Sequence, residues 1–157
     1  MLLRFTVKGN GIDPTGNPKP KIKKTARQHW TKQARDYVVW KRHVASAFCR
    51  AVEASGDESW NEYIDLLSEE KPITPPDKMS AFLFIEIELK NNKSRPDGEN
   101  VFGSIADALF KQDKYLSGAY FVPIEPIGKG AVHVTVALIE DVDTHSFNKK
   151  LKNLCEK

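Results

Sequence analysis

Three segments of the chain carry the apolar pattern of β-strands, near its beginning, its middle and its end. Hydrophobic and polar residues alternate over residues 2–8. The stretches "AFLFIEIEL", residues 81–89, and "AVHVTVALI", residues 131–139, are rich in β-branched and aromatic side chains. In the first of these stretches Glu86 and Glu88 share one face, because successive strand residues point to opposite sides. We therefore predict three strands.

Two longer segments place their apolar residues at helical spacing. Residues 31–55 predict a long helix, and a second helix follows the turn Pro96-Asp97-Gly98. The buried stripe predicted for the first helix consists of Val38, Val39, Val44, Ala45, Phe48 and Val52, with Trp40 beside it. The stripe predicted for the second consists of Val101, Phe102, Ile105, Ala108 and Leu109, which leaves Glu99, Gly103 and Asp107 on the opposite face. Shorter helices are expected over residues 60–67 and from about residue 145.

The order strand, helix, strand, helix, strand predicts an α/β (α+β) fold, in which a small mixed sheet packs with two main helices. A chain of 157 residues fits a single domain, here residues 1–157. Within this domain we interpret residues 56–80 as a variable connection and residues 141–157 as a C-terminal tail.

Composition excludes few classes of protein. The chain is 40% hydrophobic and 29% charged with a net charge of +3, as in ordinary soluble proteins. No apolar run approaches the roughly 20 residues that span a bilayer, and the apolar run in residues 1–11 is too short for a signal peptide. Cys49 and Cys155 lie far apart and form no zinc-binding pattern. These features predict a cytoplasmic protein without a membrane partner.

Basic residues are concentrated between positions 19 and 42, where nine lysines and arginines accompany a single acid, Asp36. His29, Trp30 and Tyr37 are interleaved with them. Such a segment is typical of phosphate neutralisation in nucleic-acid binding, to which aromatic stacking can contribute. A solvated helix face has the same composition, and charge alone does not separate these two interpretations.

Acidic residues surround the second long helix, in the stretch "SRPDGENVFGSIADALFKQDKYLSG". In one interpretation they are structural, because Asp97 or Gly98 can cap the helix and Glu99 is favourable in its first turn. In the other, Asp97 and Glu99 share a Mg²⁺ ion with a third oxygen ligand from elsewhere in the chain. Asp107 cannot easily share that ion, because eight helical residues separate it from Glu99 by roughly 12 Å.

A family resemblance rests on three parts of the sequence. The stretch "RPDGENVFGSIADAL", residues 95–109, resembles the acidic-x-acidic-Asn helix and following Asp-Ala-Leu of the RusA-type Holliday-junction resolvases, many of which phages and prophages encode. Residues 5–9 are similar to the first strand of that family. The stretch "NPKPKIKKTARQHW", residues 17–30, is similar to the Pro-Lys-rich segment that follows this strand in phage members. The similarity covers most of the chain in order, without residues 56–80 and the tail from residue 141.

The resemblance implies a homodimeric, Mg²⁺-dependent endodeoxyribonuclease that cuts branched double-stranded DNA in recombination and repair, and in which Mn²⁺ can substitute. It implies no small-molecule cofactor. By motif position, Asp97 and Glu99 would be metal carboxylates, and Asp107 a further catalytic acid on the exposed helix face. The residues expected to bind DNA are Lys19, Lys21, Lys23, Lys24, Arg27, Lys32, Arg35, Arg95, Lys111 and Lys114.

The sequence departs from the family pattern at two places. Gly103 stands where family members usually carry a lysine, and Ser117-Gly118 stands where an Asp-Asp pair is usual. Asp113 is the candidate replacement for the missing carboxylate, and Lys111 or Lys114 for the missing cation. Without these replacements, the resemblance implies a weakened or inactive relative that still binds DNA junctions.

Overall fold

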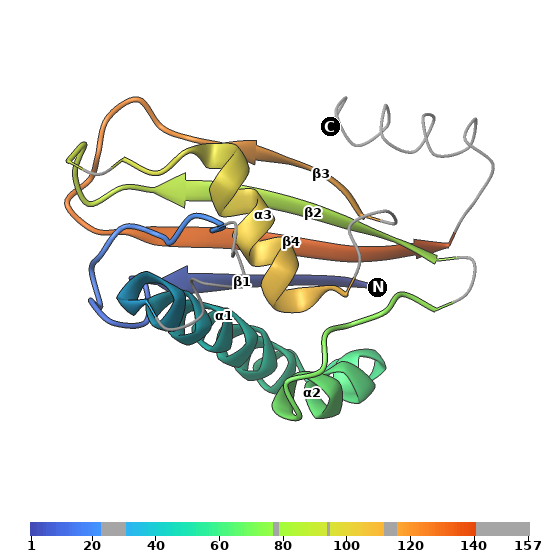
Figure 1. Cartoon of the computed structure of the whole chain (residues 1–157). Coiled ribbons are helices and arrows are strands. Elements are labelled where there is room, and N and C mark those ends of the chain that lie inside the picture. Colours follow the sequence, from blue (N-terminus) through green and yellow to red (C-terminus); the bar gives the residue numbers. More distant parts are fainter. Residues whose placement is uncertain (23–30, 77–78, 94, 112–115, 141–157) are drawn as a thin grey trace, which may run out of the picture.

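The computed structural model describes residues 1–22, 31–76, 79–93, 95–111 and 116–140 of the chain (Figure 1). The strands form a four-stranded sheet in the order β1-β4-β2-β3. The strands are β1 (Leu2–Lys8), β2 (Met79–Glu88), β3 (Leu116–Phe121) and β4 (Ala131–Glu140). β4 is antiparallel to both β1 and β2, whereas β3 is parallel to β2. The predicted small mixed sheet is therefore confirmed.

Three α-helices accompany the sheet within the described part of the chain. They are α1 (Lys32–Ser55), α2 (Asn61–Ser68) and α3 (Gly98–Leu109), and a 3₁₀ turn, η2 (Glu58–Trp60), leads into α2. α1 begins where the side chain of Thr31 accepts a hydrogen bond from the backbone N–H of Ala34 at 3.2 Å. It ends where Gly56 adopts a left-handed φ of 64°. These helices match the predicted ones, while the helix expected from residue 145 lies outside the described residues.

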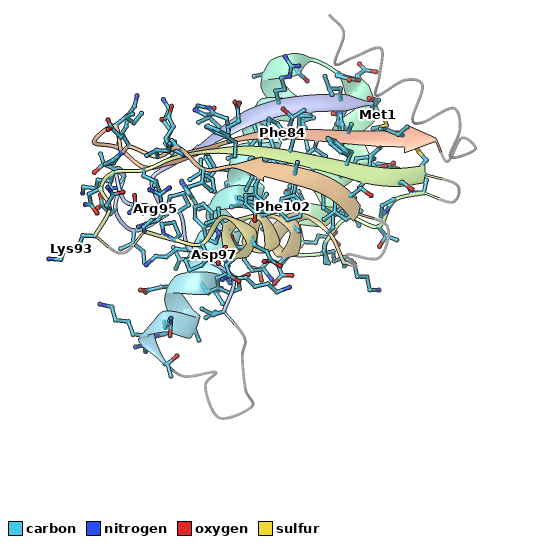
Figure 2. All side chains as sticks on the ribbon, turned by 90° about the horizontal axis from the view of Figure 1, so that it is seen from above. Met1, Phe84, Lys93, Arg95, Asp97 and Phe102 are labelled. Carbon is cyan, nitrogen blue, oxygen red and sulfur yellow. The ribbon has the colours of Figure 1, made fainter. Side chains whose placement is uncertain are left out.

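The helices α1 and α3 pack on the same face of the sheet (Figure 1). Most of the buried residues of the strands point to this face. Paired residues of neighbouring strands point to the same side of a sheet, and one such row consists of Phe5, Val134, Ile85 and Tyr120. The other face is not covered by a described helix. Figure 2 shows Phe84 on that uncovered side and Phe102 on the side of α3.

The buried face of α1 differs from the predicted stripe. Trp40 was expected beside the stripe, yet its side chain is fully buried, whereas Val38 and Val39 are 38% and 39% exposed. The large indole determines this orientation, because its burial removes more apolar surface from water than the burial of either valine does. Its N–H also finds a partner, since Trp40 Nε1 donates to Ser104 Oγ of α3 at 3.0 Å.

Strand β3 was not predicted. Its sequence "LSGAYF" has no clear alternation, and nearly all of its residues are exposed because it forms an edge of the sheet. Parallel pairing with β2 holds it in place. Gly118 permits this pairing, because a Cβ atom at that position would overlap the carbonyl oxygen of Leu83.

No helix within the described ranges is both long enough and apolar enough to cross a bilayer. The longest, α1, carries charged residues along much of its length.

We predict that Ser104→Ala lowers the free energy of unfolding by about 1–3 kcal/mol, because it leaves the buried indole N–H of Trp40 without its acceptor. Denaturation in urea measures this loss. Ser46→Ala is the matched control, since it removes the hydroxyl of an exposed helical serine on α1 and should change stability by no more than about 0.5 kcal/mol. Equal stability of the two variants would contradict the importance of this hydrogen bond.

Candidate nucleic-acid and metal site on helix α3

Asp97 and Glu99 lie at the exposed beginning of α3, next to the carboxyl end of β2 (Figure 2). Asp97 is the N-cap residue, and its Oδ1 accepts a hydrogen bond from the backbone N–H of Glu99 at 2.9 Å. The capping role predicted for Asp97 is therefore confirmed. The cap occupies one carboxylate oxygen of Asp97, while the side chains of both acids remain exposed to solvent.

Gly98 separates these two acids and is in close contact with strand β3. A Cβ atom at position 98 would lie 2.7 Å from Cδ2 and Cε2 of Tyr120 and 2.5 Å from Cγ2 of Val122. Only glycine leaves room for this approach, so the residue between the acids is fixed by packing. The acid pair is thereby held against β3 as well as at the end of β2.

Asp107, at the other end of α3, accepts two hydrogen bonds from side chains. Lys21 Nζ donates to its Oδ1 at 2.9 Å, and the hydroxyl group of Tyr37 donates to its Oδ2 at 3.1 Å. Both carboxylate oxygens thus have a partner within the protein. This arrangement makes Asp107 a residue that joins α3 to α1 and to the segment before it.

Lys21 connects the basic segment to α3 at three points. Its backbone N–H donates to the carbonyl oxygen of Asn100 at 2.7 Å, and its ammonium group pairs with Asp107. Between these contacts its side chain crosses Gly103, where an added Cβ would lie 3.2 Å from Cδ of Lys21. The absence of a side chain at position 103 therefore makes room for Lys21, and packing within the chain accounts for this glycine in the middle of a helix.

The other predicted DNA-binding residues have different surroundings. Lys32 and Arg35 are exposed in the first turn of α1, Lys111 is exposed just after α3, and Lys19 Nζ lies 3.9 Å from Oδ2 of Asp36. The guanidinium group of Arg95 donates to the carbonyl oxygens of Pro123 at 2.6 Å and Ile124 at 3.0 Å, so it holds the loop after β3. Five of the predicted site residues lie outside the described ranges: Lys23, Lys24, Arg27, Asp113 and Lys114.

Within the described ranges, no three acidic, histidine or cysteine side chains are grouped closely enough to hold a metal ion. Asp97 and Glu99 nevertheless fit the chemistry of a magnesium site that involves a nucleic acid. Such sites use one or two protein carboxylates and complete the octahedron with water and phosphate oxygens. The third predicted carboxylate, Asp113, is not among the described residues.

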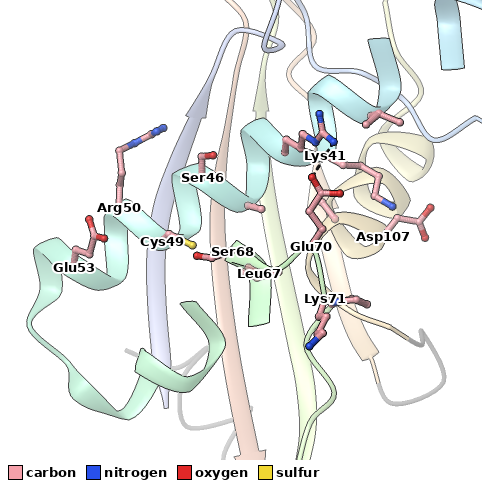
Figure 3. A pocket seen from close by; sticks show the side chains of 15 residues that line it. Lys41, Ser46, Cys49, Arg50, Glu53, Leu67, Ser68, Glu70, Lys71 and Asp107 are labelled. Carbon is pink, nitrogen blue, oxygen red and sulfur yellow. Dashed lines mark ion pairs between the residues drawn. The ribbon is translucent and has the colours of Figure 1, made fainter. Parts of the chain in front are cut away.

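A pocket of about 630 Å³ lies between α1, the segment after α2 and the end of α3, and it was not predicted (Figure 3). Its lining carries charges of both signs, and Arg42 in its wall pairs with Glu70 at 2.8 Å. Burial raises the pKa of the Cys49 thiol, and the nearby carboxylate of Glu53 adds to this effect. The thiol is therefore a poor nucleophile at neutral pH.

Burial also raises the pKa of Tyr37 well above 10, and the carboxylate of Asp107 adds to the increase. The hydroxyl proton of Tyr37 is lost near pH 10 in the unfolded chain but is kept in the folded chain. The contribution of Tyr37 to the free energy of unfolding is therefore fully present below about pH 10 and is lost as the pH rises above it. Tyr63 acts in the same direction, because burial and Glu62 raise its pKa to about 12.

We predict that Tyr37→Phe makes the free energy of unfolding fall less steeply above about pH 10, by up to about 1.4 kcal/mol per pH unit. Urea denaturation between about pH 9 and pH 11 measures the slope for the wild type and the variant. The slope for Asp107→Asn should lie between those of the wild type and Tyr37→Phe. This substitution removes the charge that adds to the increase in the pKa of Tyr37, but leaves the tyrosine buried. Identical slopes for wild type and Tyr37→Phe would contradict this assignment.

Comparison with known proteins finds no family model that matches the chain and no match among curated proteins. The resemblance to RusA-type resolvases therefore rests on the motifs quoted above and stays a prediction.

Proposed function

We propose that this protein is a Mg²⁺-dependent endodeoxyribonuclease that cuts branched DNA such as four-way junctions, in the manner of RusA-type resolvases. The observation that supports it best is the attachment of the basic segment to α3 through Lys21. The backbone bond from Lys21 to Asn100, the residue after Glu99, brings the start of the basic segment next to the acid pair. A site that cleaves a phosphodiester needs both, because cations hold the flanking phosphates while acids hold the metal.

The exposed cations around α3 would bind the DNA backbone. Lys32 and Arg35 extend from the beginning of α1, and Lys111 from the end of α3. Lys21 is paired with Asp107 at 2.9 Å, on a surface that solvent reaches. A DNA phosphate can compete for its ammonium group there, because exposed ion pairs contribute only about 0–1 kcal/mol to stability.

Asp97 and Glu99 would hold the magnesium ion, together with Asp113 as the third carboxylate. When bound, the ion stabilises the negative charge that develops on the scissile phosphate and lowers the pKa of a bound water. The protein fixes the position of the acids, because Asp97 caps α3 and Gly98 packs on β3. The carboxylate of Asp97 and the backbone between the two acids are thus held by rigid elements, as a catalytic site requires.

Two copies of the chain would act together, since symmetric cleavage of a four-way junction needs one acid pair for each of two strands. A two-fold dimer provides two identical sites with a fixed spacing. Because branched DNA is a substrate of recombination and repair, the proposal includes a location in the cytoplasm of a bacterial cell or of a phage-infected host.

A second candidate function is junction binding without cleavage. It is favoured by the position of Lys21, whose ammonium group pairs with Asp107 at the far end of α3 from the acid pair. Position 103, where RusA-type resolvases usually carry a lysine, is a glycine and supplies no cation. In this alternative the basic surface recognises DNA while the metal site is incomplete.

We predict that Asp97→Asn and Glu99→Gln each reduce junction cleavage in Mg²⁺ or Mn²⁺ by about 100-fold or more, because each removes a metal carboxylate. Binding in Ca²⁺, measured by gel shift, should remain. Asn is an equally good N-cap, so Asp97→Asn keeps α3 intact. Asp113→Asn should have the same effect if that residue supplies the third carboxylate.

Glu62→Gln is the matched control for these variants, because Glu62 is also an exposed acid in the first helical turn, but in α2. It should cleave like the wild type. Tight junction binding by a wild-type protein that cuts nothing would instead establish the second candidate function.

We also predict that affinity for DNA falls steeply with salt, because phosphate contacts release counterions. Lys21→Gln and Lys32→Gln should each reduce the slope of log affinity against log salt by about 0.9, the value for one phosphate contact. Lys8→Gln is the control, since Lys8 lies on the uncovered face of the sheet. Fluorescence anisotropy measures the slopes, and an affinity independent of salt would contradict a DNA-binding role.

A further inference from the structure

Tyr120 is an aromatic residue that lies directly beside the acid pair. It pairs in register with buried Ile85, so its side chain is on the face of the sheet that α3 covers. The ring contacts the backbone of Gly98, and its centroid lies 6.4 Å from that of Phe102 in the next turn of α3. Because Gly98 joins Asp97 to Glu99, the ring of Tyr120 and the two carboxylates form one small surface.

The side chain of Tyr120 is only partly used by this packing. Its inner edge rests on α3, yet 46% of the residue is exposed, although its row partners Ile85 and Val134 are buried. Ile124 and Ile127, in the segment after β3, are exposed as well. The outer part of the Tyr120 ring is therefore open to a ligand that approaches the acid pair.

The surroundings of Tyr120 are held firmly. Arg95 precedes the acid pair in the chain, and its guanidinium group donates to the carbonyl oxygens of Pro123 and Ile124, which follow β3. These bonds join the segment that enters α3 to the segment that leaves β3. Both segments lie at the carboxyl end of the parallel pair β2 and β3, the position where open sheets with helical crossovers commonly bind ligands.

We propose that Tyr120 forms an aromatic subsite that stacks on an unpaired base beside the acid pair Asp97 and Glu99. This inference rests on the proposed function and names the feature of the DNA that this site selects. Aromatic rings stack on any base, so the contact is tolerant of sequence. A continuous duplex keeps its bases stacked on one another, whereas a branch point can expose one. The subsite therefore favours branched over continuous DNA.

The strand offers a matched control in the next residue. Phe121 is also aromatic and is 58% exposed, but it pairs in register with Glu86. Successive strand residues point to opposite sides, so Phe121 lies on the uncovered face, away from the acid pair. Tyr120→Leu and Phe121→Leu thus remove equivalent rings from the two sides of one strand.

The experiment measures binding in Ca²⁺ to a four-way junction with 2-aminopurine at the branch point, and to the corresponding continuous duplex. Tyr120→Leu should weaken junction binding by about ten-fold, as the loss of one base stack does, and duplex binding by less than about two-fold. It should also reduce the quenching of 2-aminopurine fluorescence. Tyr120→Phe keeps the ring and should behave like the wild type, as should Phe121→Leu.

A second measurement uses the wild-type protein, so that it does not depend on the folding of a variant. Junctions with 5-iododeoxyuridine at the branch point are irradiated, and the cross-linked peptide is identified by mass spectrometry. A cross-link to Tyr120 supports the subsite, and cross-links confined to other residues overturn it.

Three further outcomes would overturn the proposal. The first is an equal loss of junction and duplex affinity in Tyr120→Leu, and the second is an equal effect of Phe121→Leu. The third is a change of oligomeric state in both leucine variants, seen by sedimentation, since this would make the edge of β3 a protein interface.

The same experiment separates failure of the subsite from failure of the proposed function. If the wild type cuts junctions and Tyr120→Leu binds them normally, only the subsite is rejected. If the wild type binds no DNA, the proposed function is rejected as well.

Discussion

The buried hydrogen bond between Trp40 and Ser104 joins the two long helices, and the position of the candidate site depends on it. α1 and α3 lie on the same face of the sheet, and this bond is a fully buried polar contact within their shared apolar interface. A buried indole N–H without an acceptor would be costly, so the helices are fixed relative to each other. The same alignment brings Tyr37 and Lys21 to Asp107, and so attaches the basic segment to α3.

Glycines determine how closely the parts of the candidate site approach one another. Gly98 admits the ring of Tyr120 between the two acids, Gly103 admits the side chain of Lys21, and Gly118 admits the backbone of β2. A Cβ atom would overlap a neighbour at positions 98 and 118, and would crowd the side chain of Lys21 at position 103. Packing within the chain therefore favours glycine at all three positions.

Asp107 has a structural role that its residue type and exposure did not indicate, while its catalytic role stays a prediction. Its place on the outer face of α3 made it a candidate acid, yet both of its oxygens accept hydrogen bonds from residues that precede α3 by many positions in the chain. Its contacts are those of a residue that positions a surface. Asp97 combines two roles that the sequence presented as alternatives, since a capping carboxylate can keep an oxygen free for a metal ion.

Local patterns in the sequence determined the elements that carry strong periodicity or good caps. Strands β1, β2 and β4 and helices α1 and α3 follow from alternation, helical spacing and the capping residues Thr31 and Asp97. Tertiary structure decided the rest. β3 depends on pairing with β2, because six mostly exposed residues carry little pattern of their own. Burial of Trp40 in place of Val38 depends on an acceptor in α3, and the contact of Lys21 with Asp107 joins positions 86 residues apart. Such contacts leave no periodic signal, since they arise from the packing of separate elements.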